Sequence, residues 1–289
     1  MIVLIHFLNA LAQGMLLALT ALGLTMIFGF LNVVNFAHGA IYMLGAYFAF
    51  AIVNTLHSFW LALILSPILV GLLGVILERF WLRKLESKDP VYSMLLTFGL
   101  ALIIENAVKM VWGTSNHSFN GPAFLQGSID IMGFPYPAYR LFVIVFSALV
   151  CLILYTLLHH TKVGIRVRAG TEDGEMALAL GINTKKLGMF VFGGGCSLAA
   201  AAGVVAGPYL SLTPDMGGLI IITTFIIITI GGMGNLAGVI VSALLVGFIQ
   251  TIGSIFMPDF AMVFVYVVMI LILIINDKGI SALIKRPTH

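Results

Sequence analysis

Polar side chains that could contact a solute are concentrated near residue 35. Asn32, Asn35 and His38 lie close together between two long apolar runs. At membrane depth, polar side chains and unwound backbone are tolerated only where they line a water-filled path or pack inside protein. We therefore predict a permeation path beside this segment. The alternative is an interfacial turn that joins two membrane spans, in which His38 caps a helix.

An acidic side chain inside an apolar run is a second candidate for chemistry. Glu105 is in this position, and ionisable groups within a membrane span commonly mark ion or proton pathways. Lys109 follows four residues later, which is the favoured order for an ion pair on a helix surface. Trp112 marks the outer interface, and a proton relay would need further acids at depth. We therefore predict a shallow ion pair.

A third group of candidates lies in a charged loop. Glu172, Asp173 and Glu175 form an acidic helix start, which suits the positive end of the helix dipole. The apolar residues 176–180 follow, and Gly181 then ends the helix. This order predicts a short helix whose apolar side chains are available to a partner. A plain solvated loop helix is the alternative.

The motifs of several enzyme classes are missing from the sequence. It contains no GxxxxGK(S/T) phosphate loop, so this chain does not hydrolyse ATP in that way. The absence of HExxH, GxSxG and paired intramembrane carboxylates argues against an intramembrane hydrolase or transferase. Cys151 and Cys196 lie far apart in apolar runs, without CxxC or ligand spacing. We predict that both cysteines are core residues and that the chain binds no metal and no cofactor.

The distribution of charge indicates where these candidates lie. The first charged residue is Glu78, and 19 of the 25 charged residues fall in three clusters, at 78–89, 162–186 and 277–286. These clusters contain 12 of the 14 lysines and arginines. No soluble domain keeps so long a stretch uncharged, because its surface must stay wet. We therefore predict a multispan membrane protein with the three clusters, and hence the C-terminus, in the cytoplasm.

Composition sets the architecture. The 289 residues are 61% hydrophobic and 9% charged, with a mean hydropathy of +1.14, far outside the globular range. A crossing needs about 20 apolar residues, so we predict an all-α polytopic bundle of eight or nine spans, forming a single transmembrane domain over residues 1–289. The net charge of +3 reflects basic inner loops and indicates no nucleic-acid partner. The N-terminus lacks the basic region and cleavage site of a secretory signal, so the first run is expected to be a retained span.

Apolar runs and turn residues give the expected boundaries. Three crossings precede Glu78, with breaks at 31–39 and 54–58, and four further crossings lie near 91–112, 141–159, 187–210 and 260–275. The first two of these four bracket an outer loop, and a cytoplasmic loop covers about 160–186. Residues 218–257 either cross twice or form a re-entrant hairpin, with a break at 231–235. Nine crossings would place the N-terminus outside, and eight result if one run is re-entrant.

Two segments have a similar pattern, in which an apolar run with threonine ends in glycine and asparagine. They are Ala21 to Asn32 and Thr223 to Asn235. Paired glycine-interrupted spans in two halves of a transporter point to a central substrate site between pseudo-symmetric repeats. The likeness is short, so a repeat and a chance similarity both remain open. The small residues of 193–203 favour close packing of helices in the membrane.

Three blocks of sequence are similar, in order along the chain, to a known family. The first comprises GLTMIFG at 23–29, VNFAHG at 34–39 and YMLGAY at 42–47; the second comprises 166–169, 172–173, 175–177 and 181–183; the third comprises AGV at 202–204, Pro208, PDMG at 214–217 and GGMGN at 231–235. Together they resemble the branched-chain amino acid ABC transporter permeases of the LivH type. The likeness extends over nearly the whole chain.

The resemblance implies a permease subunit of an importer in the bacterial inner membrane, surrounded by lipid. Its partners would be a second homologous permease, two ATP-binding subunits that hold ATP and Mg²⁺, and a periplasmic solute-binding protein. Transport would proceed by alternating access driven by the partner ATPases. Coupling to the ATPase is expected of Glu172, Asp173, Glu175, Ala177 and Gly181, and the predicted substrate path comprises Asn32, Asn35, His38, Gly39, Gly232, Gly234 and Asn235.

One departure from the family and several alternatives accompany this interpretation. Gly174 stands where relatives often carry a bulkier residue, which loosens the helix start by about 1 kcal/mol and leaves its boundary open. The solute could also be urea or a short amide. A self-sufficient secondary transporter or channel, and a membrane scaffold that moves no solute, are the alternatives from other classes.

Overall fold

The structure is a computed structural model and describes residues 2–85, 88–131 and 133–275. Its elements, in chain order, are α1 (Ile2–Leu31), α2 (His38–Leu56), α3 (Phe59–Phe80), η1 (Leu82–Leu85), α4 (Pro90–Trp112), η2 (Ala123–Leu125), β1 (Ser128–Ile131), β2 (Phe134–Pro137), α5 (Ala138–His160), α6 (Lys162–Glu172), α7 (Gly174–Ala179), α8 (Thr184–Ala206), α9 (Met216–Gly231), α10 (Leu236–Phe256), η3 (Pro258–Phe260) and α11 (Ala261–Ile275). The predicted all-α membrane bundle is confirmed.

Eight segments within the described residues are long and apolar enough to cross a membrane. They comprise α1, α2, α4, α5, α8, α10, the α3–η1 segment and the η3–α11 segment. The ninth apolar helix, α9, has only 16 residues, a rise of about 24 Å, which is shorter than the hydrocarbon core. The structure therefore agrees with the lower of the two predicted numbers of spans, and α9 is the run that does not span by length.

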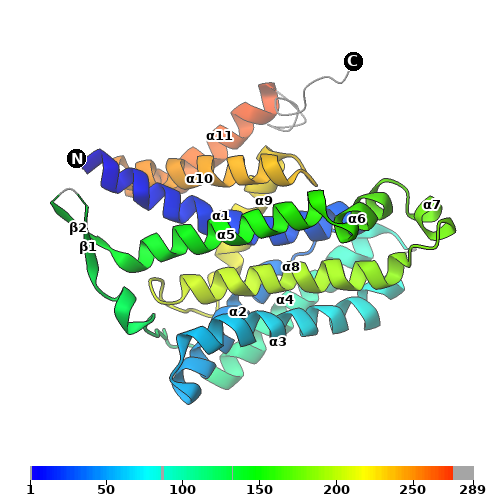
Figure 1. Cartoon of the computed structure of the whole chain (residues 1–289), viewed down its shortest axis with the longest axis horizontal. Helices are drawn as coiled ribbons and strands as arrows, with labels where there is room; N and C mark the ends of the chain where they lie inside the picture. The colour runs from blue at the N-terminus through cyan, green and yellow to red at the C-terminus, as the bar shows by residue number, and fades with distance from the viewer. Residues whose placement is uncertain (1, 86–87, 132, 276–289) are drawn as a thin grey trace.

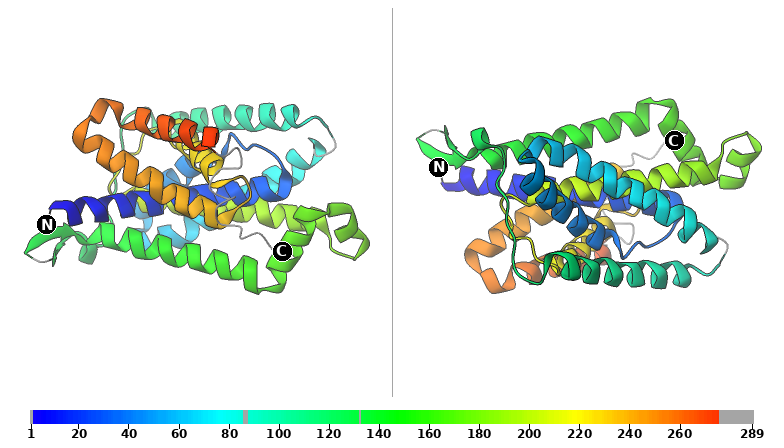
Figure 2. Two further views of the ribbon diagram at one scale, coloured as in Figure 1. Left: turned by 90° about the horizontal axis from the view of Figure 1, so that it is seen from above. Right: turned by 90° about the horizontal axis from the view of Figure 1, so that it is seen from below.

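The two ends of the bundle carry different structures (Figure 1). The start of α1 and the β1–β2 hairpin lie at one end, which we call the hairpin end, and α7 lies at the other, which we call the α7 end. Figure 2 shows α7 projecting beyond the spans. Because α1 begins at the hairpin end, the N-terminal span starts on the side opposite the charged loop.

Small residues let the central helices pack closely. Helices α1 and α8 are the most buried spans. A β-carbon built on Gly195 would lie 2.7 Å from the carbonyl oxygen of Gly23, and one on Gly45 would lie 2.7 Å from the β-carbon of Ala200. Such contacts bring backbones together where the hydrophobic effect is weak. The predicted packing role of the stretch at 193–203 is confirmed, and Cys196 is buried within it, as predicted.

Two loops contain more regular structure than the sequence indicated. The loop between α4 and α5 includes the antiparallel pair β1–β2, in the register Ser128↔Pro137, and His117 pairs with Leu212 from the loop after α8. The loop after α5 contains a second helix, α6, which Thr161 caps by accepting a hydrogen bond from the Gly164 amide at 3.3 Å. Both features use backbone groups that need partners near the membrane.

An ion pair fastens the α7 end of the bundle. The Arg83 guanidinium donates to both carboxylate oxygens of Glu78, at 3.3 and 2.7 Å, and to the carbonyl oxygen of Lys185 at 2.9 Å. The Glu78 side chain is only 5% exposed. Arg83 thus joins the segment after α3 to the start of α8, and a charge buried this deeply needs such a partner.

Replacing Arg83 with methionine is expected to lower the free energy of unfolding by about 2 kcal/mol. Removing one member of a buried ion pair costs about 3–5 kcal/mol, and the 24% exposure of Arg83 reduces that figure. The measurement is thermal unfolding of the purified chain in detergent. Arg79→Met is the matched control, because Arg79 is exposed and lies over its neighbour Phe80, so its loss should cost less than about 1 kcal/mol. Equal effects of the two changes would contradict the prediction.

Candidate functional site

Two helices begin at the same place inside the bundle. Helix α2 starts at His38 and α9 starts at Met216. A β-carbon built on Gly217 would lie 2.7 Å from the carbonyl oxygen of Gly39, and one on Gly39 would lie 2.9 Å from the carbonyl carbon of Gly217. Only glycine at both positions allows this approach. The positive ends of two helix dipoles therefore meet, a geometry that favours an anionic group such as a carboxylate.

The irregular segment before α2 is held by side chains on both sides. Asn32 has a φ of 52° and reverses the chain after α1, and the Asn35 side-chain oxygen accepts from the Ala37 amide at 3.1 Å. Thr97 of α4 donates to the Val34 carbonyl at 3.3 Å and accepts from the Phe36 amide at 3.2 Å. These bonds satisfy non-helical backbone inside protein. Thr97 was not predicted from the sequence, where its signal is a hydroxyl within an apolar run.

Buried polar atoms mark the start of α2. His38 is fully buried, and its Nε2 lies 3.0 Å from the Thr20 carbonyl oxygen. Because a carbonyl only accepts, that nitrogen carries the proton. His38 Nδ1 and the side-chain nitrogen of Asn35 are buried without a hydrogen-bond partner in the part of the chain that the structure describes. Such atoms have unused capacity to bind a polar group.

The predicted path residues separate into two places. Asn35, His38 and Gly39 lie where α2 and α9 begin, whereas residues 232–235 form the turn after α9. Gly232 and Gly234 have φ values of 86° and 84°. Gly234 approaches α1 near Gly29, and Asn235 caps α10 by accepting from the Gly238 amide at 3.2 Å.

The two segments with similar sequence patterns therefore end side by side. Gly29, in the first of them, would place a β-carbon 3.3 Å from the Cα of Gly234, in the second. Each segment stops where the backbone reverses at a positive φ, at Asn32 and at Gly232. Helix α9 spans the distance from this turn to the glycine contact with α2. It stays a prediction that all of these residues line a single substrate path.

One side of this region is open in the single chain. Leu219 and Ile222 of α9 are 64% and 46% exposed, and Phe36 is 37% exposed. The Phe36 ring packs on Phe225, with ring centroids 5.4 Å apart. A β-carbon on Gly218 would meet nothing within 4 Å. The face next to the two helix starts is thus apolar and uncovered, although its neighbours Gly39 and His38 are buried.

At the α7 end, the predicted coupling residues lie around the short helix α7. Asp173 is the N-cap, and its side chain accepts from the Met176 amide at 2.9 Å. Glu175 is in the first turn, and Gly181 follows the helix with a φ of 83°. Gly181 ends the helix, as predicted, and Asp173 caps its start, a role that was not predicted from the sequence. One boundary was wrong: Glu172 ends α6, because the extended backbone of Asp173 separates the two helices.

Helix α7 presents apolar side chains away from the bundle. Met176, Leu178 and Leu180 are 57%, 59% and 75% exposed, whereas Ala177 is 2% exposed. The Ala177 carbonyl accepts from the amide of Ile182 at 2.9 Å. The small residue thus lies under the chain that follows, and the larger apolar residues remain free to contact another molecule.

The predicted ion pair of α4 is present. Lys109 Nζ lies 2.5 Å from a Glu105 carboxylate oxygen, and both side chains are about one third exposed. The pair lies near the end of α4 that carries Trp112, whose backbone carbonyl contacts His117 Nε2 at 2.8 Å. A shallow, partly solvated pair of this kind contributes little to stability. Glu105 thus belongs to a surface pair and not to a buried site.

Comparison with known proteins gives a consistent result along the chain. Residues 6–273 match the family described as "Branched-chain amino acid transport system / permease component". The permease protein LivH of Salmonella typhimurium is 26% identical over 287 residues, and BraD of Pseudomonas aeruginosa is 29% identical over 290 residues. Each alignment covers 94% of this chain and 93% of the relative.

An archaeal relative extends the comparison. The probable branched-chain amino acid transport permease protein LivH of Methanocaldococcus jannaschii is 28% identical over 294 residues, covering 94% of this chain and 90% of that protein. No solved structure matches. Since the family match includes all eight spans except the ends of the first and last, this chain belongs to the family of permease components of branched-chain amino acid transport systems.

Proposed function

We propose that this chain is the permease subunit of an ATP-binding cassette importer that moves branched-chain or related amino acids across the bacterial inner membrane. The observation that carries the proposal is the family match over residues 6–273. The short helix α7, with its exposed apolar residues, adds a feature that a subunit driven by a separate ATPase requires. A related importer for urea or a short amide is the alternative within the same architecture.

The proposed orientation follows from charge. The described residues of the clusters at 78–89 and 162–186 lie at the α7 end (Figure 1), which we assign to the cytoplasm because short basic loops remain inside. The C-terminus is assigned to the same side from its cluster at 277–286, which lies outside the described residues. The hairpin end then faces the periplasm and the solute-binding protein. The ATP and Mg²⁺ of the cycle belong to the partner ATPases.

The proposed coupling element comprises Glu172, Asp173, Glu175, Ala177 and Gly181. In the proposed cycle, α7 docks on an ATP-binding subunit and moves with it when ATP closes the ATPase pair. The α6–α7 unit is joined to the bundle where Gly170 packs on Phe30 of α1, so its movement is transmitted to the spans. Coupling requires ATP and the loaded binding protein to favour different conformations.

The proposed substrate path passes the point where α2 and α9 begin. An amino acid brings a carboxylate, which two converging helix starts can attract, and an apolar side chain, which the exposed residues Leu219 and Ile222 can accept. A second permease subunit would close the open face next to these residues. Each permease thus supplies half of the path. The paired helix starts resemble the broken helices of transporters whose substrate sites lie near the membrane midplane.

Reconstitution tests this function. The chain is purified with its cognate permease and ATPases, placed in proteoliposomes and supplied with the binding protein, and uptake of radiolabelled L-leucine and urea is measured with and without ATP. We expect leucine uptake that requires both ATP and the binding protein. Uptake by this chain alone, without ATP, would instead favour a secondary transporter or channel. ATP-dependent uptake of urea but not leucine would favour the related importer, and assembly without any solute uptake would favour a scaffold.

A further inference from the structure

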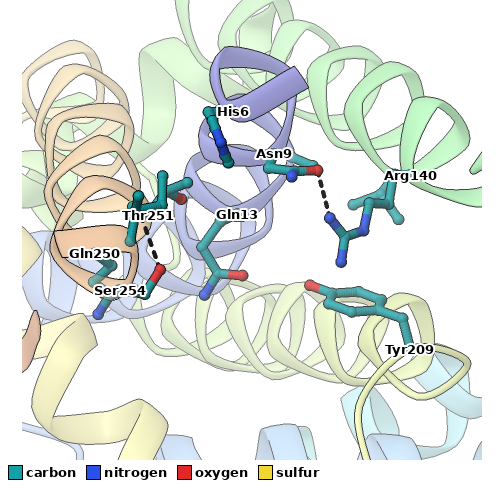
Figure 3. A pocket seen from close by; sticks show the side chains of 11 residues that line it. His6, Asn9, Gln13, Arg140, Tyr209, Gln250, Thr251 and Ser254 are labelled. Carbon is teal, nitrogen blue, oxygen red and sulfur yellow. Dashed lines mark hydrogen bonds between the residues drawn. The ribbon is translucent and has the colours of Figure 1, made fainter. Parts of the chain in front are cut away.

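A polar cavity lies at the hairpin end of the bundle. Its volume is about 470 Å³, and it is lined by α1, α5, α10 and the residue Tyr209, which follows α8 (Figure 3). Eight of the eleven residues that line it have polar side chains, among them His6, Asn9, Gln13 and Gln250. Lipid tails offer no hydrogen-bond partners, and burying polar groups without such partners is costly. The composition of the cavity therefore indicates a polar ligand.

Arg140 is the charged group of this cavity. Its guanidinium donates to the side-chain oxygen of Asn9, which also accepts from the Tyr136 hydroxyl at 3.1 Å. Asn9 is neutral, so the positive charge is not balanced by this bond. A guanidinium has five N–H donors, and the bond to Asn9 leaves others directed towards the cavity (Figure 3).

The charge of Arg140 is exceptional in this chain. Arg140 and Lys109 are the two basic residues that lie outside the three charged clusters. Lys109 is paired with Glu105. Within residues 2–85, 88–131 and 133–275, the ion pairs join Lys109 to Glu105 and Arg83 to Glu78, and none includes Arg140. A partly buried guanidinium without a carboxylate is a ready partner for an external anion.

A further donor faces the same space. The Tyr209 hydroxyl points towards the region in front of Arg140, and Gln13 turns its side-chain oxygen to that side (Figure 3). Burial raises the pKa of the Tyr209 phenol, an effect that the nearby Arg140 charge partly opposes, so the hydroxyl stays protonated at neutral pH and can donate. The floor also includes the apolar Val143. The cavity thus combines one cation, one neutral donor and an apolar patch.

We propose that this cavity is a binding site for an oxyanion, a carboxylate or phosphate group, held by Arg140 and Tyr209. Its lining residues come from α1, α5, α10 and the segment after α8, so they belong neither to the proposed coupling helix nor to the helix starts of α2 and α9. Because α5 begins at Ala138, two residues before Arg140, the guanidinium lies at the level of the membrane interface. Two sources can deliver the group there: a lipid headgroup of the outer leaflet, or a free amino acid.

Binding experiments on the purified full chain distinguish these sources. In one arm, native mass spectrometry measures the binding of phosphatidylglycerol added to the detergent-solubilised protein. In the other, a scintillation proximity assay measures the binding of radiolabelled L-leucine. Both arms compare the wild type with Arg140→Gln and with Lys109→Gln, the matched control that removes the other isolated cation. We expect Arg140→Gln to weaken binding at least about tenfold in one arm, and Lys109→Gln to behave as the wild type.

The arm that responds identifies the source of the anion. A second variant, Asn9→Asp, keeps the Arg140 side chain in place and provides it with an internal carboxylate, so it should also weaken binding even if Arg140→Gln fails to fold. The proposal would be overturned if the wild type bound neither ligand. It would also be overturned if the affinities of the Arg140 and Asn9 variants stayed within about twofold of the wild type. A loss that is equally large in Lys109→Gln would also overturn it, because the effect would not be specific to the cavity.

Discussion

Replacing Gly217 with alanine is expected to lower the free energy of unfolding by about 3 kcal/mol and to abolish transport. The new β-carbon would lie 2.7 Å from the Gly39 oxygen, 2.8 Å from its carbonyl carbon and 3.0 Å from the Ala40 nitrogen. All three are backbone atoms of the first turn of α2, so no side chain can move aside. Overpacking of this kind typically costs 1–3 kcal/mol, and the rigid contact places this change at the upper end.

The neighbouring glycine provides the control. Gly218→Ala introduces the same methyl group one residue later, where nothing lies within 4 Å. It should be neutral or stabilise α9 by up to about 1 kcal/mol, because alanine is the better helix former. The measurement is thermal unfolding in detergent, with an expected fall in the midpoint of about 6–12 °C for Gly217→Ala. If the two variants unfold at the same temperature, the helix starts of α2 and α9 are not in contact.

The second large effect is expected at α7, and this prediction rests on the proposed function. The double variant Glu175→Ala and Gly181→Val should reduce ATP-driven uptake at least about tenfold while the spans stay folded. Gly181 has a φ of 83° and its amide donates to the Leu178 carbonyl at 3.0 Å. A β-branched residue there is strained by about 1–3 kcal/mol, which is large for a helix of six residues. The change therefore disrupts the helix that the ATPase would contact.

The control for α7 lies within the same helix. Gly174 is its first residue, and a β-carbon there would meet nothing within 4 Å. Gly174→Ala should retain uptake, since alanine strengthens the helix start. Complex assembly is measured by copurification of the ATPase, and coupling by substrate-stimulated ATP turnover in proteoliposomes. Unchanged assembly and turnover in the double variant would remove α7 from the mechanism, while leaving the transport assay of the whole complex unaffected.

The spans could be predicted from the sequence because the bilayer imposes a local requirement. Each crossing needs a run of apolar residues of a certain length, and polar or glycine-rich breaks separate the runs. The prediction of 91–112 therefore corresponds to α4, Pro90–Trp112, and the predicted break at 231–235 corresponds to the turn after α9. The C-terminal end of α7 could also be predicted, since Gly181 acts on the backbone within a few residues.

The structural features that were not predicted have only a weak pattern in the sequence. Helix α6 and the boundary at Glu172 were not predicted, because the charged residues 162–172 lack the apolar period of a long helix. The β1–β2 hairpin is held by backbone pairing between Ser128 and Pro137 and so carries little side-chain signal. Arg140 was passed over because it is a single cation near a predicted span end. The sequence distinguishes Arg140 only by its position outside the three charged clusters.

The sequence by itself determined which segments are helices, which ends carry charge and which family the chain resembles. It could not determine which helices touch. In a membrane protein most helix faces are apolar, and small residues permit many pairings of similar energy. The contact of Gly39 with Gly217, and the bond from Arg140 to Asn9, each join residues more than 100 positions apart. Only the tertiary structure decided them, because they depend on close approach of backbones and side chains that no local pattern encodes.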